Sequence, residues 1–317
     1  MLQENTVQSQ INRIRDLINI PWKHYGLRQD RALFPQLCSA LDVIGDTEEA
    51  ITAFETKELG GSKAAHYLAV YGLLQAMFVQ QDAVFNLCEL LGVEERIQDY
   101  PELKEIREVR NVSVGHPTKR DRPRGSPISY HHISRRTLDD SGFTLLSFFE
   151  DGRSQFRHIE IAKLMTEQIR FICEILSVIV SKLEQEERAH KEEFRMEKLT
   201  GIFPNTLGYH IEKVFEGIFR EDLAEFAMIN LDTVSKTLQD FREAVGRRDM
   251  DFYESLQDEY DLIEHAISHL DGYFKALMND DEPETDKLTI RIFAIFLRNQ
   301  VDGLKRCAQD IDREYAE

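Results

Sequence analysis

The chain has 317 residues, more than one compact core usually holds, so two domains or one domain with a long helical extension are expected. Hydrophobic residues make up 42% of it and charged residues 30%, which excludes wholesale disorder. A net charge of −18, if spread evenly, would repel a polyanion, and this argues against a general nucleic-acid or anionic-membrane binder.

The four cysteines are widely separated and lie in helical-looking segments, so we expect reduced, structural thiols in a cytoplasmic protein. The N-terminal residues lack the basic and apolar regions of a signal peptide. The most apolar stretch, residues 169–183, contains Glu174 and is shorter than the ~20 apolar residues of a membrane span. We therefore expect a soluble chain with no membrane contact.

Helical periodicity covers most of the chain, because only 8 prolines and 16 glycines interrupt it. Helix starts are predicted at Asp46-Thr47 and at Ser62, whose side-chain oxygens can accept hydrogen bonds from first-turn amides. The predicted helices span residues 7–19, 29–44, 47–58, 62–92, 101–114, 155–199, 207–219, 221–246, 251–279 and 285–315.

The predicted helix 62–92 is apolar on nearly all sides, a pattern typical of a central, buried helix. Its middle nevertheless carries Gln80, Gln81 and Asp82. Two interpretations stay open. Either Gln81 is a hydrogen-bonded core residue beside a solvated neighbour, or Gln81 and Asp82 line a polar cleft.

The non-helical stretch covers residues 115–151. Residues 128–134 and 142–149 predict two strands, joined through the turn-forming sequence Asp139-Asp140-Ser141-Gly142. A lone hairpin is marginally stable, so it should pack against the helices.

The apolar stripe of the next helix ends at Leu183 and gives way to residues charged on all sides, which places the domain boundary there. The predicted fold is mainly all-α. It comprises an N-terminal helical bundle over residues 1–190, with a β-hairpin insertion at about 118–151, and a C-terminal antiparallel three-helix bundle over residues 200–317.

Charge is divided unevenly between these parts. Residues 200–317 hold 26 acidic and 13 basic residues, a net of −13, whereas residues 1–199 hold 31 and 26, a net of −5. The C-terminal bundle should therefore avoid nucleic acid, and its acidity would suit a basic protein partner. A polyanionic ligand at the N-terminal domain is not excluded.

One motif stands at the end of the predicted helix 101–114, which closes with the sequence RNVSVGHP over residues 110–117. Regular helix geometry would put Arg110 and His116 on different faces, but a helix that unwinds at Gly115 can return the imidazole toward the guanidinium. Arginine offers a fork of donors to a phosphate, and histidine transfers protons near neutral pH. RNA supplies its own nucleophile, the 2′-hydroxyl, so such a pair can cleave a phosphodiester without a metal.

An Arg–His pair at a helix end, with asparagine directly after the arginine, resembles the HEPN family of nucleotide-binding and RNA-cleaving helical domains over roughly residues 60–185. The resemblance implies a metal-independent endoribonuclease without a cofactor, acting in a defence or toxin system. It also implies a homodimer in which the Arg–His pairs of two chains meet in one cleft. Arg110 would then stabilise the scissile phosphate, His116 would act as acid or base, and Asn111 would orient one of them. The hairpin inserted after the motif departs from the minimal helical bundle.

The pattern of an arginine, four to six residues and a histidine recurs at residues 124–131 and 153–158, although the helix-end context and Asn111 favour the first pair. A structural alternative stays open. Arg110 would pair with an acid such as Glu105 or Glu108, and residues 115–117 would merely end the helix.

Local charge supports a phosphate ligand near the motif. Between residues 117 and 136, six basic side chains stand against one acidic side chain, a net of +5. Such an island would attract a phosphate backbone, the alternative being a solvated loop whose arginines pair with acidic neighbours. The predicted RNA-binding residues are Lys119, Arg120, Arg122, Arg124, Tyr130, Arg135 and Arg136.

Two functions follow from the sequence: a HEPN-like ribonuclease, or a non-catalytic helical module that binds protein, nucleotide or RNA. A metal enzyme is a weaker third hypothesis. His265 and His269 are one helical turn apart, with Asp261 a turn earlier, but no matching second pair of ligands appears, so no metal site is predicted.

Overall fold

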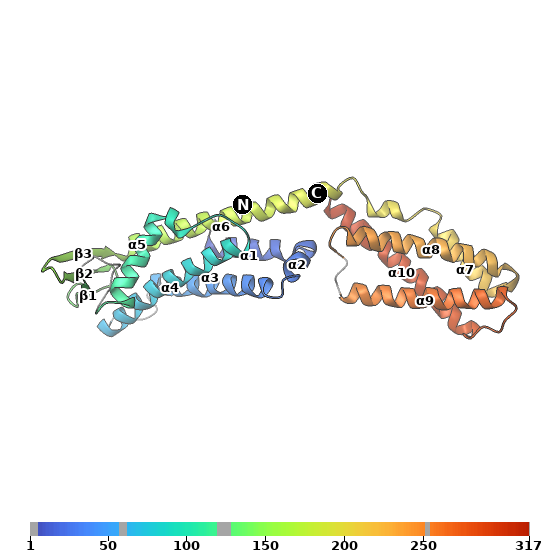
Figure 1. Ribbon diagram of the computed structural model, residues 1–317, viewed down its shortest axis with the longest axis horizontal. Helices are drawn as coiled ribbons and strands as arrows, with labels where there is room; N and C mark the ends of the chain where they lie inside the picture. The colour runs from blue at the N-terminus through green and yellow to red at the C-terminus, as the bar shows by residue number, and fades with distance from the viewer. Residues whose placement is uncertain (1–5, 57–61, 119–127, 251–253, 317) are drawn as a thin grey trace. The chain divides into compact units, whose positions relative to one another are not determined.

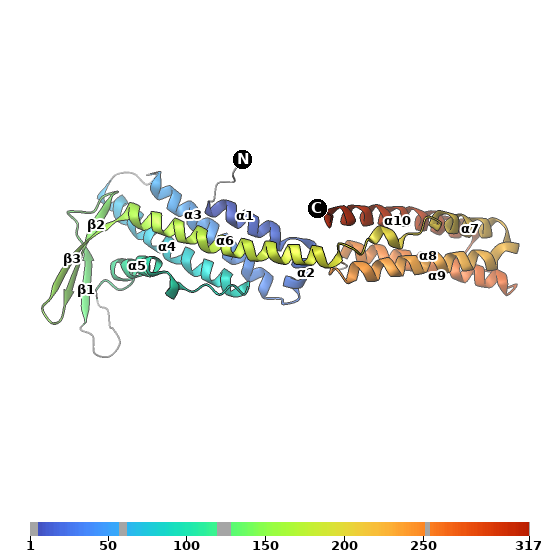
Figure 2. The ribbon, with the colours of Figure 1, turned by 90° about the horizontal axis from the view of Figure 1, so that it is seen from above.

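The computed structural model describes residues 6–56, 62–118, 128–250 and 254–316. The chain is mainly helical and carries a small three-stranded antiparallel sheet, which confirms the predicted fold class (Figures 1 and 2). It divides into two compact units, one of residues 1–20 and 27–185 and the other of residues 21–26 and 186–317.

The first unit is built on helices whose apolar faces share one core. Its elements are α1 (Val7–Ile18), α3 (Leu33–Glu55), α4 (Lys63–Leu90), the short turn η1 (Ile97–Asp99), α5 (Pro101–Arg110), the π-helical turn η2 (Asn111–Gly115) and the first part of α6 (Ile161–Phe194). Helix α2 (Pro21–Arg28) follows α1, and α3 packs along α4. The predicted start of α4 is confirmed, because Ser62 Oγ accepts a hydrogen bond from the Ala65 amide at 3.1 Å.

The predicted helix break before Asp46-Thr47 is wrong, because α3 continues through it as one helix. The Thr47 hydroxyl donates back to the carbonyls of Val43 (2.7 Å) and Ile44 (3.0 Å), so it is satisfied inside the helix and caps nothing. Ile44 and Ile51 are buried on one apolar face, and this burial stabilises a continuous helix through the polar residues 46–49.

The insertion after α5 contains β1 (Ser129–Ile133), β2 (Gly142–Phe149) and β3 (Ser154–Glu160), in that order across the sheet. The predicted hairpin is present, and its turn is tightened by Asp139, which accepts from the amides of Ser141 and Gly142. Gly142 also lies where β2 meets β3, and a Cβ there would stand 2.1 Å from the Ile159 carbonyl oxygen.

The third strand corrects the prediction of a helix from residue 155. Phe156 and Ile159 have helical spacing, but they lie on opposite faces of β3, with Phe156 exposed and Ile159 buried. Pairing with β2 supplies hydrogen-bond partners for the backbone of Ser154–Glu160, and α6 begins directly afterwards.

A chain of buried amides crosses the core of the first unit. Gln80 donates to Glu48 (2.8 Å) and accepts from Gln168 (2.8 Å), and Gln168 in turn accepts from Gln81 (2.7 Å). Gln168 also donates to the Met77 carbonyl at 3.1 Å. The three glutamine side chains have no exposed surface, so Gln80 and Gln81 in the middle of α4 belong to the core.

The second unit contains η3 (Leu199–Ile202), α7 (Leu207–Phe219), η4 (Glu221–Leu223), α8 (Ala224–Gly246), α9 (Glu254–Met278) and α10 (Lys287–Glu314). Helices α8, α9 and α10 pack together, as predicted from their apolar seams, and α7 packs against α8 and α10 as a further member of the bundle. Short links between consecutive helices keep neighbours antiparallel, as Figure 2 shows for α8 and α9.

One cation is buried in this second unit. The Arg248 side chain is almost fully enclosed and donates to the backbone carbonyls of Ala244 and Glu197. Its guanidinium carbon lies 4.8 Å from the ring centre of Phe194. Burial lowers the pKa of Arg248 from its usual value.

Candidate functional site

The Arg110 guanidinium is held in place from several sides. Its Nε and Nη2 donate to Gln75 Oε1 at 3.0 and 2.7 Å, and its Nη1 donates to Asn111 Oδ1 at 3.1 Å. The guanidinium carbon also lies 4.3 Å from the ring centre of Phe78. These contacts use three of its five N–H groups, and the other two have no partner among the described residues. Arg110 thus binds neutral amides, and the proposed partner Glu105 pairs instead with Arg157 at 2.5 Å.

The π-helical turn brings the backbone of residues 111–115 against this guanidinium. A Cβ placed on Gly115 would lie 2.9 Å from Arg110 Nη1, so only glycine lets the turn pass so close. The His116 amide donates to the Asn111 carbonyl at 2.7 Å, which closes the turn, and the His116 side chain is exposed. The helix unwinds at Gly115, and His116 follows the residue that touches the guanidinium.

A cleft of about 1020 Å³ borders this motif. Ser113 of η2 and Pro117 and Thr118, which follow His116, form one side of it. The other walls are Tyr67 and Tyr71 of α4, residues 131–136 in and after β1, and Leu146 of β2. The cleft therefore lies directly beside the segment that carries His116.

Ser113 is a buried polar residue in the wall of this cleft. Its hydroxyl has no hydrogen-bond partner among the residues that the structure describes. Leaving such a group unpaired costs about 1–3 kcal/mol. Buried groups that keep such a cost are found at functional sites more than elsewhere, so Ser113 marks this turn as a place to look for a ligand.

The basic island is placed only in part. Lys119, Arg120, Arg122 and Arg124 lie outside the described residues. Arg135 and Arg136 are exposed and line the cleft. Tyr130 lies on the outward face of β1, with its side chain exposed.

Of the two other Arg–His pairs, the structure separates the one at residues 153–158 and describes only the histidine of the one at residues 124–131. Residues 153–158 lie along β3, where an extended chain separates the ends by roughly 16 Å. Arg153 pairs with Asp151 at 2.7 Å. His131 is buried, and its ring nitrogens lie 2.8 and 2.9 Å from the hydroxyls of Ser147 and Ser129, while Arg124 is outside the described residues.

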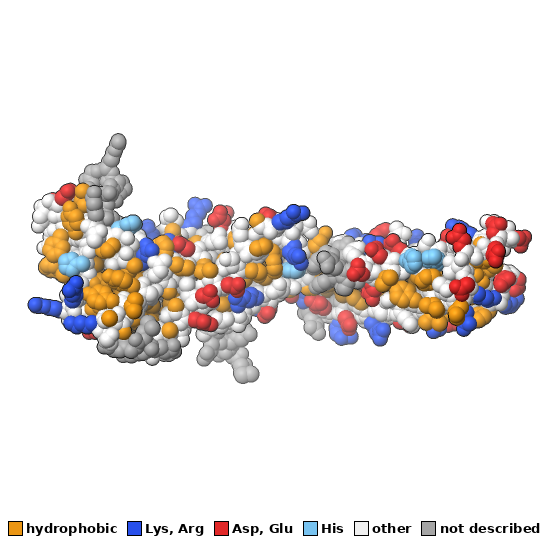
Figure 3. Space-filling view, turned by 90° about the horizontal axis from the view of Figure 1, so that it is seen from below, with side chains coloured by type: hydrophobic (Ala, Val, Ile, Leu, Met, Phe, Trp, Pro, Cys, Tyr) orange, Lys and Arg blue, Asp and Glu red, His pale blue; other side chains and the backbone are white. Residues whose placement is uncertain are grey.

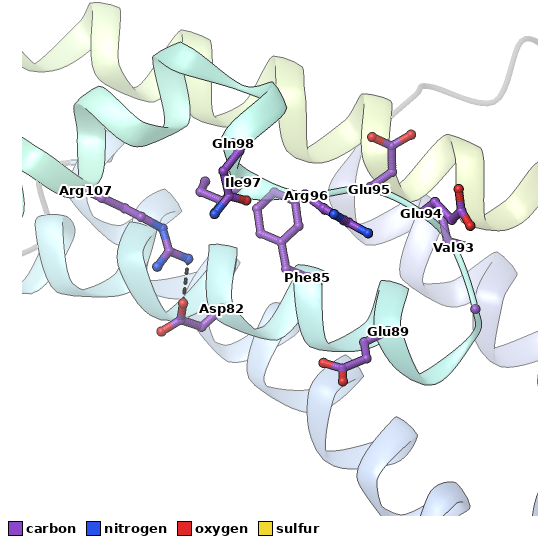
Figure 4. A pocket seen from close by; sticks show the side chains of 11 residues that line it. Asp82, Phe85, Glu89, Val93, Glu94, Glu95, Arg96, Ile97, Gln98 and Arg107 are labelled. Atoms are coloured by element: carbon purple, nitrogen blue, oxygen red, sulfur yellow. Dashed lines mark hydrogen bonds and ion pairs between the residues drawn. The ribbon is translucent and has the colours of Figure 1, made fainter.

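The predicted cleft residues of α4 are separated by the structure. Gln81 is fully buried and accepts from Arg107 Nε at 2.7 Å, so it does not line a cleft. Asp82 is exposed and pairs with Arg107 at 2.5 Å on the rim of a second hollow of about 630 Å³ (Figure 4). That hollow also carries Glu89, Glu94 and Glu95 against Arg96, so its charge disfavours a phosphate.

In the described part of the chain, no group of three or more His, Cys, Asp and Glu side chains is arranged to hold a metal ion. His269 stacks on Phe293 with ring centres 4.9 Å apart, and its Nδ1 contacts Thr285. Burial raises the pKa of Cys88 to about 12 and that of Cys173 to about 11, which keeps both thiols protonated.

Sequence reasoning missed several residues of this site. Gln75 and Phe78, which fix Arg110, lie a full helix earlier in the chain. Tyr67 and Tyr71 belong by spacing to an apolar stripe of α4, yet they reach the cleft. A local pattern could have flagged only Ser113, because a polar residue stands there between two valines.

The chain matches no protein-family model, no curated protein and no solved structure. No helix in the described residues is long and apolar enough to cross a membrane.

Proposed function

We propose that this chain is a metal-independent endoribonuclease of the HEPN type, with Arg110, Asn111 and His116 in its active site. The observation that carries the proposal is the fixed guanidinium of Arg110. Two of its N–H groups have no partner within the described part of the chain, and it lies against Gly115, one residue before the exposed His116.

The chemistry follows from these groups. The 2′-oxygen of RNA attacks the adjacent phosphorus, the bond from phosphorus to the 5′-oxygen breaks, and the products are a 2′,3′-cyclic phosphate and a 5′-hydroxyl. Negative charge builds on the non-bridging oxygens, where a preorganised guanidinium stabilises it without reorganisation. Asn111 orients Arg110 through its amide oxygen, which favours this role over that of orienting His116.

Proton transfer explains why two chains would act together. The 2′-hydroxyl loses a proton and the leaving 5′-oxygen gains one, and a single imidazole cannot be base and acid at the same instant. One His116 from each chain of a homodimer would supply both functions. The cleft beside residues 116–118, with Arg135 and Arg136 on its wall, would hold the flanking phosphates.

The test is RNA cleavage in the presence of EDTA by the wild type and by His116→Ala. We expect the variant to lose about 10²- to 10⁴-fold in rate, the usual contribution of a positioned acid or base. His265→Ala is the matched control, because His265 is also exposed but lies on α9 of the second unit, and it should cleave at the wild-type rate. An RNA with a 2′-deoxy nucleotide at the scissile position should not be cut. Equal rates for the wild type and His116→Ala would refute the proposal.

A non-catalytic interaction module is the second candidate. It is favoured by the surface of the second unit, which is acidic and exposes large apolar side chains on its helices. These residues are Tyr209, Phe219, Phe226, Ile229, Leu262, Leu288, Ile292 and Ile295. A basic, partly apolar protein would suit this surface. RNA that binds the wild type and is recovered uncut would favour this candidate.

A further inference from the structure

The small sheet of the first unit has an exposed aromatic face. Strand alternation turns Tyr130 of β1, Phe148 of β2 and Phe156 of β3 away from the buried face, where they are 42%, 39% and 63% exposed. The register places Tyr130 opposite Phe148, and Phe156 opposite Leu146. The other face of the sheet is buried, as His131 and Phe143 show.

These rings form one continuous surface across the three strands. His132 stacks on Phe148 with ring centres 5.7 Å apart and an angle of 14°, and Phe148 meets Phe156 edge to face at 6.2 Å and 75°. Figure 3 shows hydrophobic side chains, a histidine and basic side chains beside one another at this end of the unit. Exposed aromatic clusters of this kind mark binding surfaces.

Two cations lie beside the aromatic face. Arg135 and Arg136 follow β1 and line the same cleft as His132 and Leu146. The carboxylates of the two turns are already engaged: Asp139 accepts turn amides, Asp140 pairs with His66 and Asp151 pairs with Arg153. Glu150 and Glu160 lie at the two ends of the face.

We infer that this aromatic face, formed by Tyr130, His132, Phe148 and Phe156, binds the unpaired bases of single-stranded RNA. Bases of any sequence stack on aromatic rings while their phosphates contact nearby cations, whereas a duplex hides the faces of its bases. His132 and Leu146 belong both to this face and to the wall of the cleft beside His116, so a strand stacked on the sheet can continue into the cleft. The choice of RNA over DNA rests on the proposed function.

Binding is measured in the His116→Ala background, so that the RNA stays intact, with a labelled single strand of roughly 12 nucleotides and EDTA present. Phe156→Ala should weaken binding about 5- to 150-fold, which corresponds to the ~1–3 kcal/mol that stacking of one base contributes. Phe156 is 63% exposed, so its truncation leaves the core intact. Phe219→Ala is the matched control, because Phe219 is 58% exposed but lies in the acidic second unit, and this variant should bind as its parent does.

A second measurement detects stacking directly. Phe156→Trp should keep the affinity, and its fluorescence should be quenched by single-stranded RNA, whereas Phe219→Trp should show no quenching. Tyr130→Ala should weaken binding in the same way as Phe156→Ala, with Tyr209→Ala as its exposed counterpart in the second unit. Duplex RNA should compete poorly with the single strand.

Unchanged affinity in both Phe156→Ala and Tyr130→Ala would overturn the inference. So would a loss of self-association in these variants with RNA affinity retained, because the face would then be an interface between copies. Single-stranded DNA binding as tightly as RNA would overturn the choice of RNA.

If the wild type binds RNA through Phe156 but leaves it uncut in EDTA, the ribonuclease proposal fails while base stacking is supported. If the wild type cleaves RNA and Phe156→Ala keeps full affinity, base stacking fails while the ribonuclease proposal is supported.

Discussion

The two units place polar groups in their interiors in contrasting ways. The first unit buries a chain of neutral amides, which link Gln80, Gln168 and Gln81. The second unit buries a cation, Arg248, in a core that is otherwise mainly apolar. A neutral amide needs only hydrogen bonds to be tolerated, whereas a buried cation also loses its hydration, so its partners carry more of the stability. Substitutions in these two interiors should therefore lower the free energy of unfolding by different amounts, and each should affect only its own unit.

The largest expected effect is that of Arg248→Ala. The substitution opens a cavity beside Phe194 and leaves the backbone carbonyls of Ala244 and Glu197 without this donor, which should lower the free energy of unfolding of the second unit by about 2–5 kcal/mol. The only tryptophan, Trp22, reports this unit, because it stacks on His190 with ring centres 4.2 Å apart. Urea denaturation followed by Trp22 fluorescence measures the change.

The neighbouring residue provides a control for this experiment. Arg247 is half-exposed and forms a surface ion pair with Glu197, so Arg247→Ala should cost less than about 1 kcal/mol. If Arg248→Ala and Arg247→Ala lower the free energy of unfolding equally, the burial of Arg248 adds no stability beyond that of a surface arginine.

A smaller loss is expected from Gln168→Leu in the first unit. Leucine keeps most of the volume but removes the donor to Gln80 Oε1 and to the Met77 carbonyl and the acceptor for Gln81 Nε2, at a cost of about 1–3 kcal/mol. Far-UV circular dichroism during denaturation should show an earlier transition while the Trp22 transition stays in place. Gln36→Leu, on the exposed side of α3, is the control and should shift neither. A shift of both transitions by Gln168→Leu would mean that the units do not unfold independently.

The sequence predicted the helices of both units well, because long apolar periodicities fix a helix without tertiary information. It predicted least well where two local signals competed. Residues 154–160 fit a helix by the spacing of Phe156 and Ile159, and only pairing with β2 shows that they form a strand. Thr47 resembles a cap because the same hydroxyl can bond within a helix or at its start.

The candidate site was predictable only in its local part. Arg110, Asn111 and His116 are close in sequence, and Gly115 signalled that the helix would end. The partner Gln75 stands 35 residues before Arg110, and no periodicity connects the two. The aromatic face was missed for a similar reason, since Phe156 joins Phe148 only after the third strand is placed.

The next largest effect is expected from Gly115→Ala, because Gly115 lies close to the Arg110 guanidinium in the π-helical turn. Gly115→Ala would put a methyl group 2.9 Å from Arg110 Nη1 and displace the guanidinium, which should reduce RNA cleavage about 10- to 100-fold without unfolding the first unit. Gly72→Ala is the matched control, because a Cβ at this position of α4 meets nothing within 4 Å, and it should cleave at the wild-type rate. The measurement is the single-turnover rate in EDTA. If Gly115→Ala cleaves RNA at the same rate as Gly72→Ala, the position of the Arg110 guanidinium does not matter for cleavage.

The smallest expected effect is the contribution of His190 to the pH dependence of stability in the second unit. Burial lowers the pKa of His190 from its usual 6.5, while Glu193 and Asp249 partly oppose the shift. The unfolded chain therefore takes up a proton at a higher pH than the folded unit does. The stability that His190 contributes is present in full above about pH 6.5 and is lost as the pH falls from there through the lower pKa of the folded state. His190→Phe keeps a ring against Trp22 but cannot titrate, so its unfolding free energy should fall less than that of the wild type between pH 7.5 and 5.5. Parallel pH profiles for the two proteins would show that the acid sensitivity of the second unit lies elsewhere.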